Sequence, residues 1–160
     1  MDKGQIRKAR LKDVLRIVKL HSYLIKHLHS VNPRMYTESA DKSEQKRFEK
    51  NLKKYLKDKN SLVLVYEINN KINGYAISRI KEYPSFISFR KYGEIHEVVV
   101  SKDMQEKGIG SKFVKKIISF FKSRKVKIAE LLIDSRNLAG LKAWSKAGFK
   151  EELKIMKKFI

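Results

Sequence analysis

The sequence predicts an α/β protein of the α+β kind, in which helices flank one mixed, mostly antiparallel sheet. Apolar residues recur at helical spacing in some segments and alternate, or run without interruption, in shorter ones. The chain has 160 residues, of which 42% are hydrophobic, close to the ~150 residues of one domain and sufficient for a core. We therefore expect a single domain over residues 1–160, without internal repeats or linkers.

The N-terminal part of the chain predicts a short strand followed by two helices. Gln5–Leu11 alternates enough for a strand, and Asp13 is a suitable cap for a helix that Asn32-Pro33 ends. A second helix starts near Asp41, because Glu44 stands three residues later, as in a capping box.

A β-hairpin follows, and then strands and helices alternate. Ser61–Ile68 and Ile72–Tyr83 are rich in β-branched and apolar residues and are separated by the turn sequence Asn69-Asn70-Lys71. The remaining predicted elements are an aromatic-rich loop over Pro84–Gly93, a strand over Glu94–Val100, a helix opened by Gly108, a strand over Ile128–Asp134, a helix over Asn137–Ala147 and a last strand within Phe149–Ile160.

Composition excludes several classes of protein. There is no cysteine, which excludes a disulfide framework, a thiolate nucleophile and a cysteine-based zinc site. No metal is expected, because His21, His27 and His29 pair poorly along one helix face and fit a partly exposed helix better. No run of apolar residues approaches a membrane span or a signal peptide, so we expect a cytoplasmic protein without a membrane partner.

The net charge of +21 raises the question of nucleic acid. The lysines are spread along the chain instead of forming one basic arm, and most fall on predicted solvent faces of helices. A lysine-rich solvated surface is therefore favoured over a nucleic-acid site.

A glycine loop between a strand and a helix carries the clearest functional signal. Three valines, Val98-Val99-Val100, lead into a loop that contains Gly108 and Gly110 and opens an amphipathic helix. Unpaired N–H groups at a helix N-terminus suit a pyrophosphate, and glycines allow close approach. The loop lacks the third glycine of a Rossmann fingerprint and the Gly-Lys-Ser/Thr of a P-loop.

Two segments together resemble the Gcn5-related N-acetyltransferase (GNAT) family. Gln105, Gly108 and Gly110 match its Gln/Arg-x-x-Gly-x-Gly/Ala signature. A second motif lies one helix and one strand later, in the family's order, and the resemblance covers nearly the whole chain. That second motif is carried by Asn137, Gly140, Trp144, Gly148 and Phe149.

The resemblance implies an acyltransferase that takes acetyl-CoA as donor in a cleft between two splayed strands. The pantetheine would pair with the strand of Val98, Val99 and Val100. Asn137 and Trp144 would flank the thiol end. The structural alternatives are that Asn137 is a helix N-cap and that Trp144 is a core residue. The pyrophosphate would lie on the loop formed by Gln105, Glu106, Lys107, Gly108, Ile109, Gly110 and Ser111.

The resemblance also places a general base on the strand before the loop. His96 and Glu97 are favoured equally and Glu94 third, with surface charges as the alternative. On an ideal strand Glu94 and His96 share a face with Val98 and Glu97 faces the other way, but a bulge would change this.

The family's usual acid, a tyrosine, is replaced here by Trp144, whose indole N–H cannot supply a proton. The thiolate would then be protonated by Ser145, by a tyrosine from elsewhere in the chain or by water, or no side chain would act as the acid. This departure keeps a second function open, a catalytically weak binding module that uses its basic surface for nucleic acid or a protein partner.

The expected function is therefore transfer of an acetyl group to a primary amine of an unidentified acceptor, a protein, a peptide or a small molecule. Acceptor specificity is expected on the surface from His27 to Tyr36 and in the loop from Tyr83 to Tyr92. A homodimer is a further partner that the sequence leaves open.

Overall fold

A computed structural model describes residues 4–160 and contains one sheet of five strands in the order β1-β2-β3-β4-β5. The first four strands pair antiparallel with their neighbours and β5 pairs parallel with β4, which confirms the predicted mixed, mostly antiparallel sheet. The strands are β1 (Gln5–Lys8), β2 (Ser61–Ile68), β3 (Lys71–Glu82), β4 (Lys91–Val100) and β5 (Ala129–Glu130).

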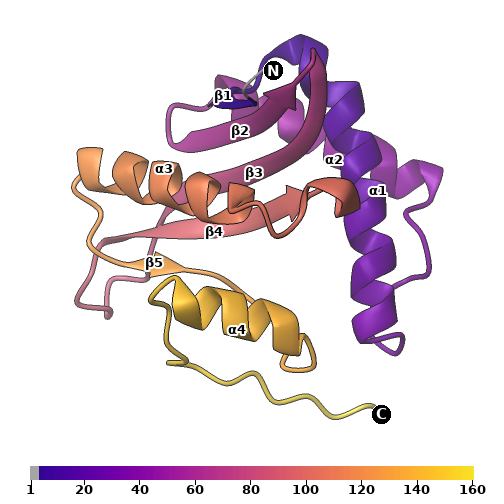
Figure 1. Cartoon of the computed structure of the whole chain (residues 1–160). Helices are drawn as coiled ribbons and strands as arrows, with labels where there is room; N and C mark the ends of the chain where they lie inside the picture. The colour runs from indigo at the N-terminus through magenta and orange to yellow at the C-terminus, as the bar shows by residue number, and fades with distance from the viewer. Residues whose placement is uncertain (1–3) are drawn as a thin grey trace.

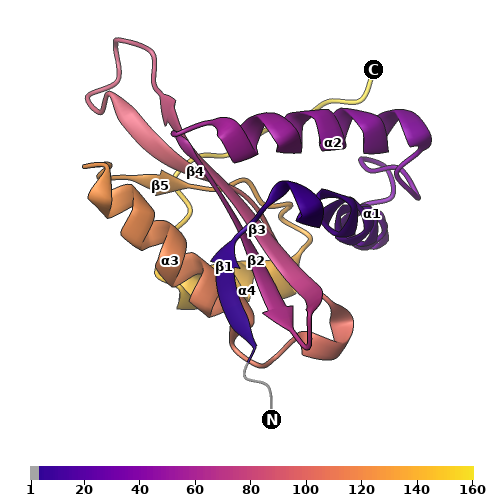
Figure 2. The same ribbon diagram turned by 90° about the horizontal axis from the view of Figure 1, so that it is seen from above.

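Helices cover both faces of the sheet (Figure 1). Viewed from above, α1 and α2 lie on one side of the strands and α3 on the other (Figure 2). None of the helices in the described part of the chain is long and apolar enough to cross a membrane. The helices are α1 (Val14–Val31), α2 (Lys42–Lys57), α3 (Ile109–Ser123) and α4 (Leu138–Lys146), with short 3-10 turns at η1 (Leu11–Asp13) and η2 (Lys102–Met104).

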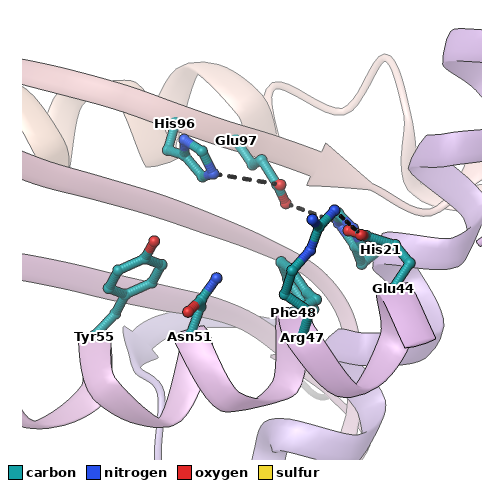
Figure 3. A pocket seen from close by; sticks show the side chains of 8 residues that line it. All are labelled: His21, Glu44, Arg47, Phe48, Asn51, Tyr55, His96 and Glu97. Atoms are coloured by element: carbon teal, nitrogen blue, oxygen red, sulfur yellow. Dashed lines mark hydrogen bonds and ion pairs between the residues drawn. The ribbon is translucent and has the colours of Figure 1, made fainter. Parts of the chain in front are cut away.

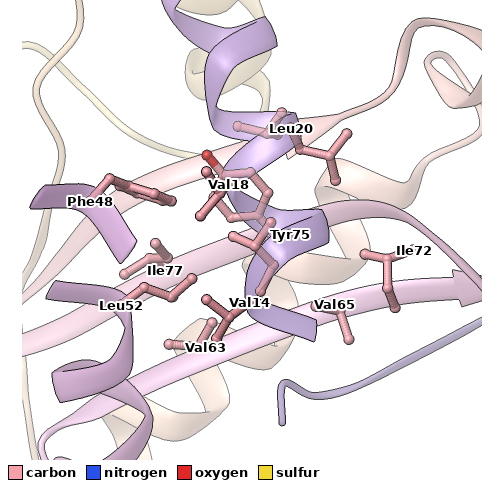
Figure 4. Packing of buried hydrophobic residues seen from close by; sticks show 12 residues of the cluster. Val14, Val18, Leu20, Phe48, Leu52, Val63, Val65, Ile72, Tyr75 and Ile77 are labelled. Atoms are coloured by element: carbon pink, nitrogen blue, oxygen red, sulfur yellow. The ribbon is translucent and has the colours of Figure 1, made fainter. Parts of the chain in front are cut away.

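Each face of the sheet has its own hydrophobic core. On the face of α1 and α2, Ile17 and Leu52 belong to one cluster with Tyr75 and Ile77 of β3, and all four are fully buried. Figure 4 shows Leu52, Tyr75 and Ile77 in this cluster. On the opposite face, Phe113 and the other apolar residues of α3 pack on β2, β3 and β4. The apolar periodicity of these helices therefore predicted their buried sides.

The β2–β3 hairpin is closed by the predicted turn. Asn69 and Asn70 have φ angles of 50° and 57°, which asparagine tolerates better than most residues. Asp41 also caps α2 as predicted, because its side chain accepts a hydrogen bond of 2.7 Å from the Glu44 N–H. Asp13 behaves differently: its side chain does not cap α1 but binds Arg7 at 2.7 Å.

Strand β4 has an irregularity in the middle and a free edge at its end. Its pairing with β3 shifts register between Ile77 and Ser78: Ile77 pairs with Glu97 and Ser78 with Ile95, so His96 is an extra, bulged residue. On its other edge, β4 pairs with β5 only at Gly93 and Glu94 among the described residues. The two strands therefore part directly before the bulge.

Some predicted boundaries are wrong. The strand expected over Ile128–Asp134 is limited to Ala129–Glu130, because β4 and β5 separate. Strand β4 begins at Lys91 instead of Glu94. Tyr92 stacks on Tyr83 with 4.3 Å between ring centroids, and the pairing of β4 with β3 therefore extends to Lys91.

The last strand, expected within Phe149–Ile160, is absent from the structure. Residues 149–160 form no helix or strand, and residues 150–160 are exposed. The end of the segment reaches the connection between α1 and α2, where Arg34 lies 4.3 Å from the ring of Phe159. The two paired residues of β5 provide little ladder for a further strand to join.

Candidate functional site

A pocket of about 320 Å³ lies between β4 and the two N-terminal helices. Side chains of α2 face the bulged part of β4 across it, and one side chain of α1 closes one end (Figure 3). The pocket is lined by His21, Glu44, Arg47, Phe48, Asn51, Tyr55, His96 and Glu97.

The bulge brings His96 and Glu97 to the same side of β4 as Glu94, and of these three predicted bases His96 and Glu97 line the pocket. Glu94 lies near Arg79 and Lys81, His96 lies 6.5 Å from the ring of Tyr55 on α2, and Glu97 reaches His21 on α1. Val98, in contrast, packs into the core on the α3 face. The ideal-strand expectation, which paired Glu94 and His96 with Val98 and set Glu97 apart, is therefore wrong for the reason that it named, a bulge.

Glu97 is held by two buried side chains, Tyr75 and His21. Its Oε2 accepts a hydrogen bond of 2.5 Å from the hydroxyl of Tyr75 and lies 3.3 Å from Nδ1 of His21. Its side chain is 11% exposed and borders the pocket. Burial, followed by the charge of Glu97, raises the pKa of Tyr75 well above its usual value, so this hydroxyl stays a donor.

Glu94 does not line the pocket, and His96 lines it but is more exposed than Glu97. Glu94 pairs with Lys81 at 3.1 Å and lies 3.9 Å from Arg79. The hydrogen bond to Glu94 raises the pKa of Lys81, so this ammonium stays charged. His96 is 41% exposed, and its Nε2 lies 3.8 Å from Oε1 of Glu97.

His21 is a pocket residue that the sequence interpretation missed. The ring is buried, is 6% exposed as a side chain, and stacks on Phe48 with 3.6 Å between ring centroids. Its other nitrogen, Nε2, lies 3.6 Å from Oε1 of Glu44 and makes no hydrogen bond within the described chain. The one available signal was that His21 falls on the apolar stripe of its helix, where an unpaired imidazole is costly.

The glycine loop lies between β4 and α3, and Gly108 opens the helix as predicted. Gly108 is the N-cap of α3 with a φ of +73°, a conformation that glycine adopts without strain. A Cβ added at Gly110 would meet nothing within 4 Å, so the packing of the chain itself does not require a glycine there. The loop leaves open space beside the N-terminus of α3, where the first N–H groups have no partner inside the helix and a negative charge is favoured.

The other loop residues take different positions. Gln105 is exposed, and its Nε2 donates to the carbonyl of Val100 at 3.1 Å. Ile109, the first residue of α3, is buried, while Glu106, Lys107 and Ser111 are exposed. Val99 is buried in the core on the side of α1 and α2, whereas Val98 and Val100 pack on the side of α3.

The two residues predicted on α4 have clear structural roles. Asn137 is the N-cap of α4, and its side chain accepts a hydrogen bond of 2.9 Å from the Gly140 N–H. Trp144 is half-buried and packs edge-on against Phe149 at 5.3 Å, in the same core as Val98 and Val100. No group of three potential metal ligands occurs within residues 4–160.

Residues 25–149 match the acetyltransferase (GNAT) family, a range that includes β4, the glycine loop and α4. The chain belongs to this family. The resemblance inferred from Gln105, Gly108 and Gly110 is thereby confirmed.

Relatives of known sequence are also acetyltransferases by name. The chain is 32% identical over 88 residues to an uncharacterized N-acetyltransferase of Methanocaldococcus jannaschii, covering 55% of this chain and 38% of the relative. It is 34% identical over 95 residues to an uncharacterized N-acetyltransferase of Archaeoglobus fulgidus, covering 58% of this chain and 63% of the relative. The chain therefore spans less than two thirds of the length of either relative.

A solved structure shares the fold over almost its whole length. A predicted acetyltransferase from Clostridium acetobutylicum, crystallised with acetyl-CoA, superposes with a TM-score of 0.80 at 17% identity. The match covers 98% of this chain and 96% of the other. The expected fold class is thereby confirmed.

The packing of Trp144 gives a prediction about stability. Trp144→Ala should lower the free energy of unfolding by about 3 kcal/mol, the low end for an aromatic truncation, because the ring is only half-buried. Trp144→Tyr keeps a large aromatic ring and should cost under about 1.5 kcal/mol. Urea denaturation followed by circular dichroism measures both. An alanine variant as stable as the parent would contradict the packing of α4 on this core.

Proposed function

We propose that this chain is an acetyl-CoA-dependent N-acetyltransferase that acetylates a primary amine. The observation that carries the proposal is the parting of β4 from β5 beside a pocket with a well-held carboxylate. The donor is assigned to the free edge of β4 and the glycine loop, and the acceptor to the pocket between β4, α1 and α2. Family membership supports the reaction class.

The residues of the loop fit acetyl-CoA. The space beside Gly108 and Gly110 is open, and the helix N-terminus behind it favours a phosphate charge. The edge of β4 from Ile95 to Val100 has no strand partner on the β5 side among the described residues, so its peptide groups are available to a pantetheine amide. When bound, acetyl-CoA supplies an activated acetyl group as a thioester.

Glu97 is proposed as the general base. An acceptor amine arrives as an ammonium, and Glu97 accepts its proton, so that the nitrogen lone pair becomes free to attack the thioester carbonyl. Tyr75 and His21 hold the carboxylate toward the pocket. Glu94 is less suited because Lys81 and Arg79 already neutralise it, and His96 is less suited because it lies 41% exposed at the bulge.

No side chain is proposed as the acid that protonates the thiolate. Trp144 stands where the family has its usual tyrosine, and an indole N–H does not release a proton at neutral pH. Ser145 is exposed on α4. Solvent therefore provides this proton, and orientation of the two substrates provides most of the rate enhancement.

The proposed function is tested by release of CoA thiol from acetyl-CoA in the presence of a panel of primary amines. The panel includes peptides with free N-termini, lysine-containing peptides, diamines and amino sugars. We expect time-dependent thiol release and a product heavier by one acetyl group. Binding of acetyl-CoA without transfer to any amine would favour the binding-module alternative.

Gly110→Asp tests the donor site. The new carboxylate would enter the space assigned to the pyrophosphate and repel it, so we expect the Kd for CoA to rise at least tenfold, or about 1.4 kcal/mol. Gly110→Ala is the matched control, since its methyl group adds bulk without charge and meets no atom of the chain. Isothermal titration gives both affinities. Unchanged affinity in a folded aspartate variant would refute the assignment of the loop.

Glu97→Gln tests the base. The variant keeps the shape of the side chain but cannot take a proton, so kcat/KM should fall about 100-fold or more near neutral pH. Activity should recover as the pH rises toward the pKa of the acceptor, about 8 for an α-amine and about 10.4 for a lysine-type amine.

His96→Gln and Glu94→Gln are the matched controls from the same strand. Both should keep the parent pH–rate profile. A parent-like profile for Glu97→Gln, with the loss found in His96→Gln instead, would transfer the role of base to His96.

A further inference from the structure

The acceptor pocket contains a buried nitrogen that has no hydrogen-bond partner within residues 4–160. Nδ1 of His21 lies 3.3 Å from Oε2 of Glu97 and 3.4 Å from the hydroxyl oxygen of Tyr75. Because Tyr75 donates its own proton to Glu97, both oxygens accept from the ring, and the proton of a neutral His21 is assigned to Nδ1. Nε2 then keeps a lone pair that is buried and unpaired within residues 4–160.

A second acceptor, a carboxylate oxygen of Glu44, faces this nitrogen. Oε1 of Glu44 lies 3.6 Å from Nε2, beyond the usual range of a hydrogen bond. The other oxygen of Glu44 binds Arg47, an exposed side chain one turn further along α2. Oε1 therefore stays available on the pocket side. A lone pair and a carboxylate that face each other without a proton lack a donor, and a ligand that brings one is stabilised there.

We infer that Nε2 of His21 and Oε1 of Glu44 form a second cation subsite, and that the acceptor is a short diamine or an amine of that kind. This inference rests on the proposed function. The amine to be acetylated meets Glu97, and a second ammonium group a few bonds away donates to His21 and Glu44. One ammonium has three donors and can satisfy both acceptors at once.

The spacing of the two subsites limits the length of the acceptor. A single imidazole ring separates them, with Glu97 3.3 Å from one ring nitrogen and Glu44 3.6 Å from the other. Both carboxylates line the same pocket of about 320 Å³. The two amino groups of the acceptor must therefore be close along one chain, as in ethanediamine, propanediamine or butanediamine, and a long acceptor would place its second charge outside the pocket.

A cation fits this subsite better than a neutral donor. The chain as a whole carries +21, yet two carboxylates, Glu44 and Glu97, border this one pocket beside a single guanidinium, Arg47, which pairs with only one oxygen of Glu44. A hydrogen bond from a charged donor to a carboxylate is about twice as strong as a neutral one. The subsite therefore selects the ammonium of a diamine over the hydroxyl of an amino alcohol.

The inference is tested by comparing acceptors that differ only in the second group. Release of CoA thiol gives kcat/KM for the three diamines, for propylamine and for aminopropanol. The best diamine should exceed propylamine and aminopropanol by about tenfold or more, well above the twofold advantage of having two reactive amines. Glu44→Gln should remove most of this preference by raising the KM for the diamine, while kcat changes little.

Glu49→Gln is the matched control, since Glu49 lies on the same helix, pairs with Lys53 and does not line the pocket. It should keep the parent preference. A Glu44→Gln variant with the parent preference, or a parent enzyme that prefers propylamine or treats aminopropanol as it treats the diamine, overturns the subsite.

A second measurement separates this inference from the proposed function. If no amine is acetylated, the proposed function fails, and the subsite is tested by isothermal titration of propanediamine into the chain with CoA present. Binding that weakens at least tenfold in Glu44→Gln and is unchanged in Glu49→Gln supports the subsite. Absence of binding, or equal binding to both variants, overturns it.

Discussion

The bulge at His96 is the constraint on which the site depends. Ile95 and Val99 are four positions apart, so on a regular strand they would point to the same face of the sheet. In this protein Ile95 is buried against α3 and Val99 against α1 and α2, and both cores need these side chains. Only an extra residue in β4 satisfies both cores. The same residue turns Glu97 toward the pocket, so hydrophobic burial on two faces positions a carboxylate that neither core contains.

Burying the Glu97 carboxylate, which is 11% exposed, costs free energy unless hydrogen-bond partners offset it, and three elements provide or support these partners. Tyr75 of β3 donates a short hydrogen bond, and His21 of α1 lies on the same oxygen. The His21 ring is held in turn by its stacking on Phe48 of α2. The position of Glu97 therefore depends on the packing of both helices against the sheet, and movement of either helix would change the orientation of the proposed base as well as the shape of the pocket.

Local sequence patterns predicted most of the fold and the glycine loop, because each depends on residues close together in the chain. The two asparagines of the β2–β3 turn, the cap at Asp41 and the glycine at the start of α3 act within a few residues. The pocket depends instead on contacts between distant segments. His21 and Glu97 are 76 positions apart, and nothing in the spacing along α1 indicates that they meet. The missing last strand has a similar cause: Phe149–Ile160 has enough apolar residues for a strand, but a strand also needs a partner edge, and β5 offers two residues.

The net charge of the chain acts on ligands at long range, whereas the charged side chains of the pocket act at short range. A charge of +21 draws the anionic phosphates of acetyl-CoA toward the protein and repels a cationic acceptor, but at physiological ionic strength this field is screened beyond about 8 Å. Inside the pocket the nearest charges decide. Two opposite charges about 4 Å apart near a protein surface attract by about 4 kcal/mol before desolvation. Two carboxylates, Glu44 and Glu97, border the pocket against one guanidinium, Arg47, which is paired with Glu44. On the proposed function, the lysine-rich surface therefore assists capture of the donor, while the short-range carboxylates offset the repulsion of the acceptor where the reaction takes place.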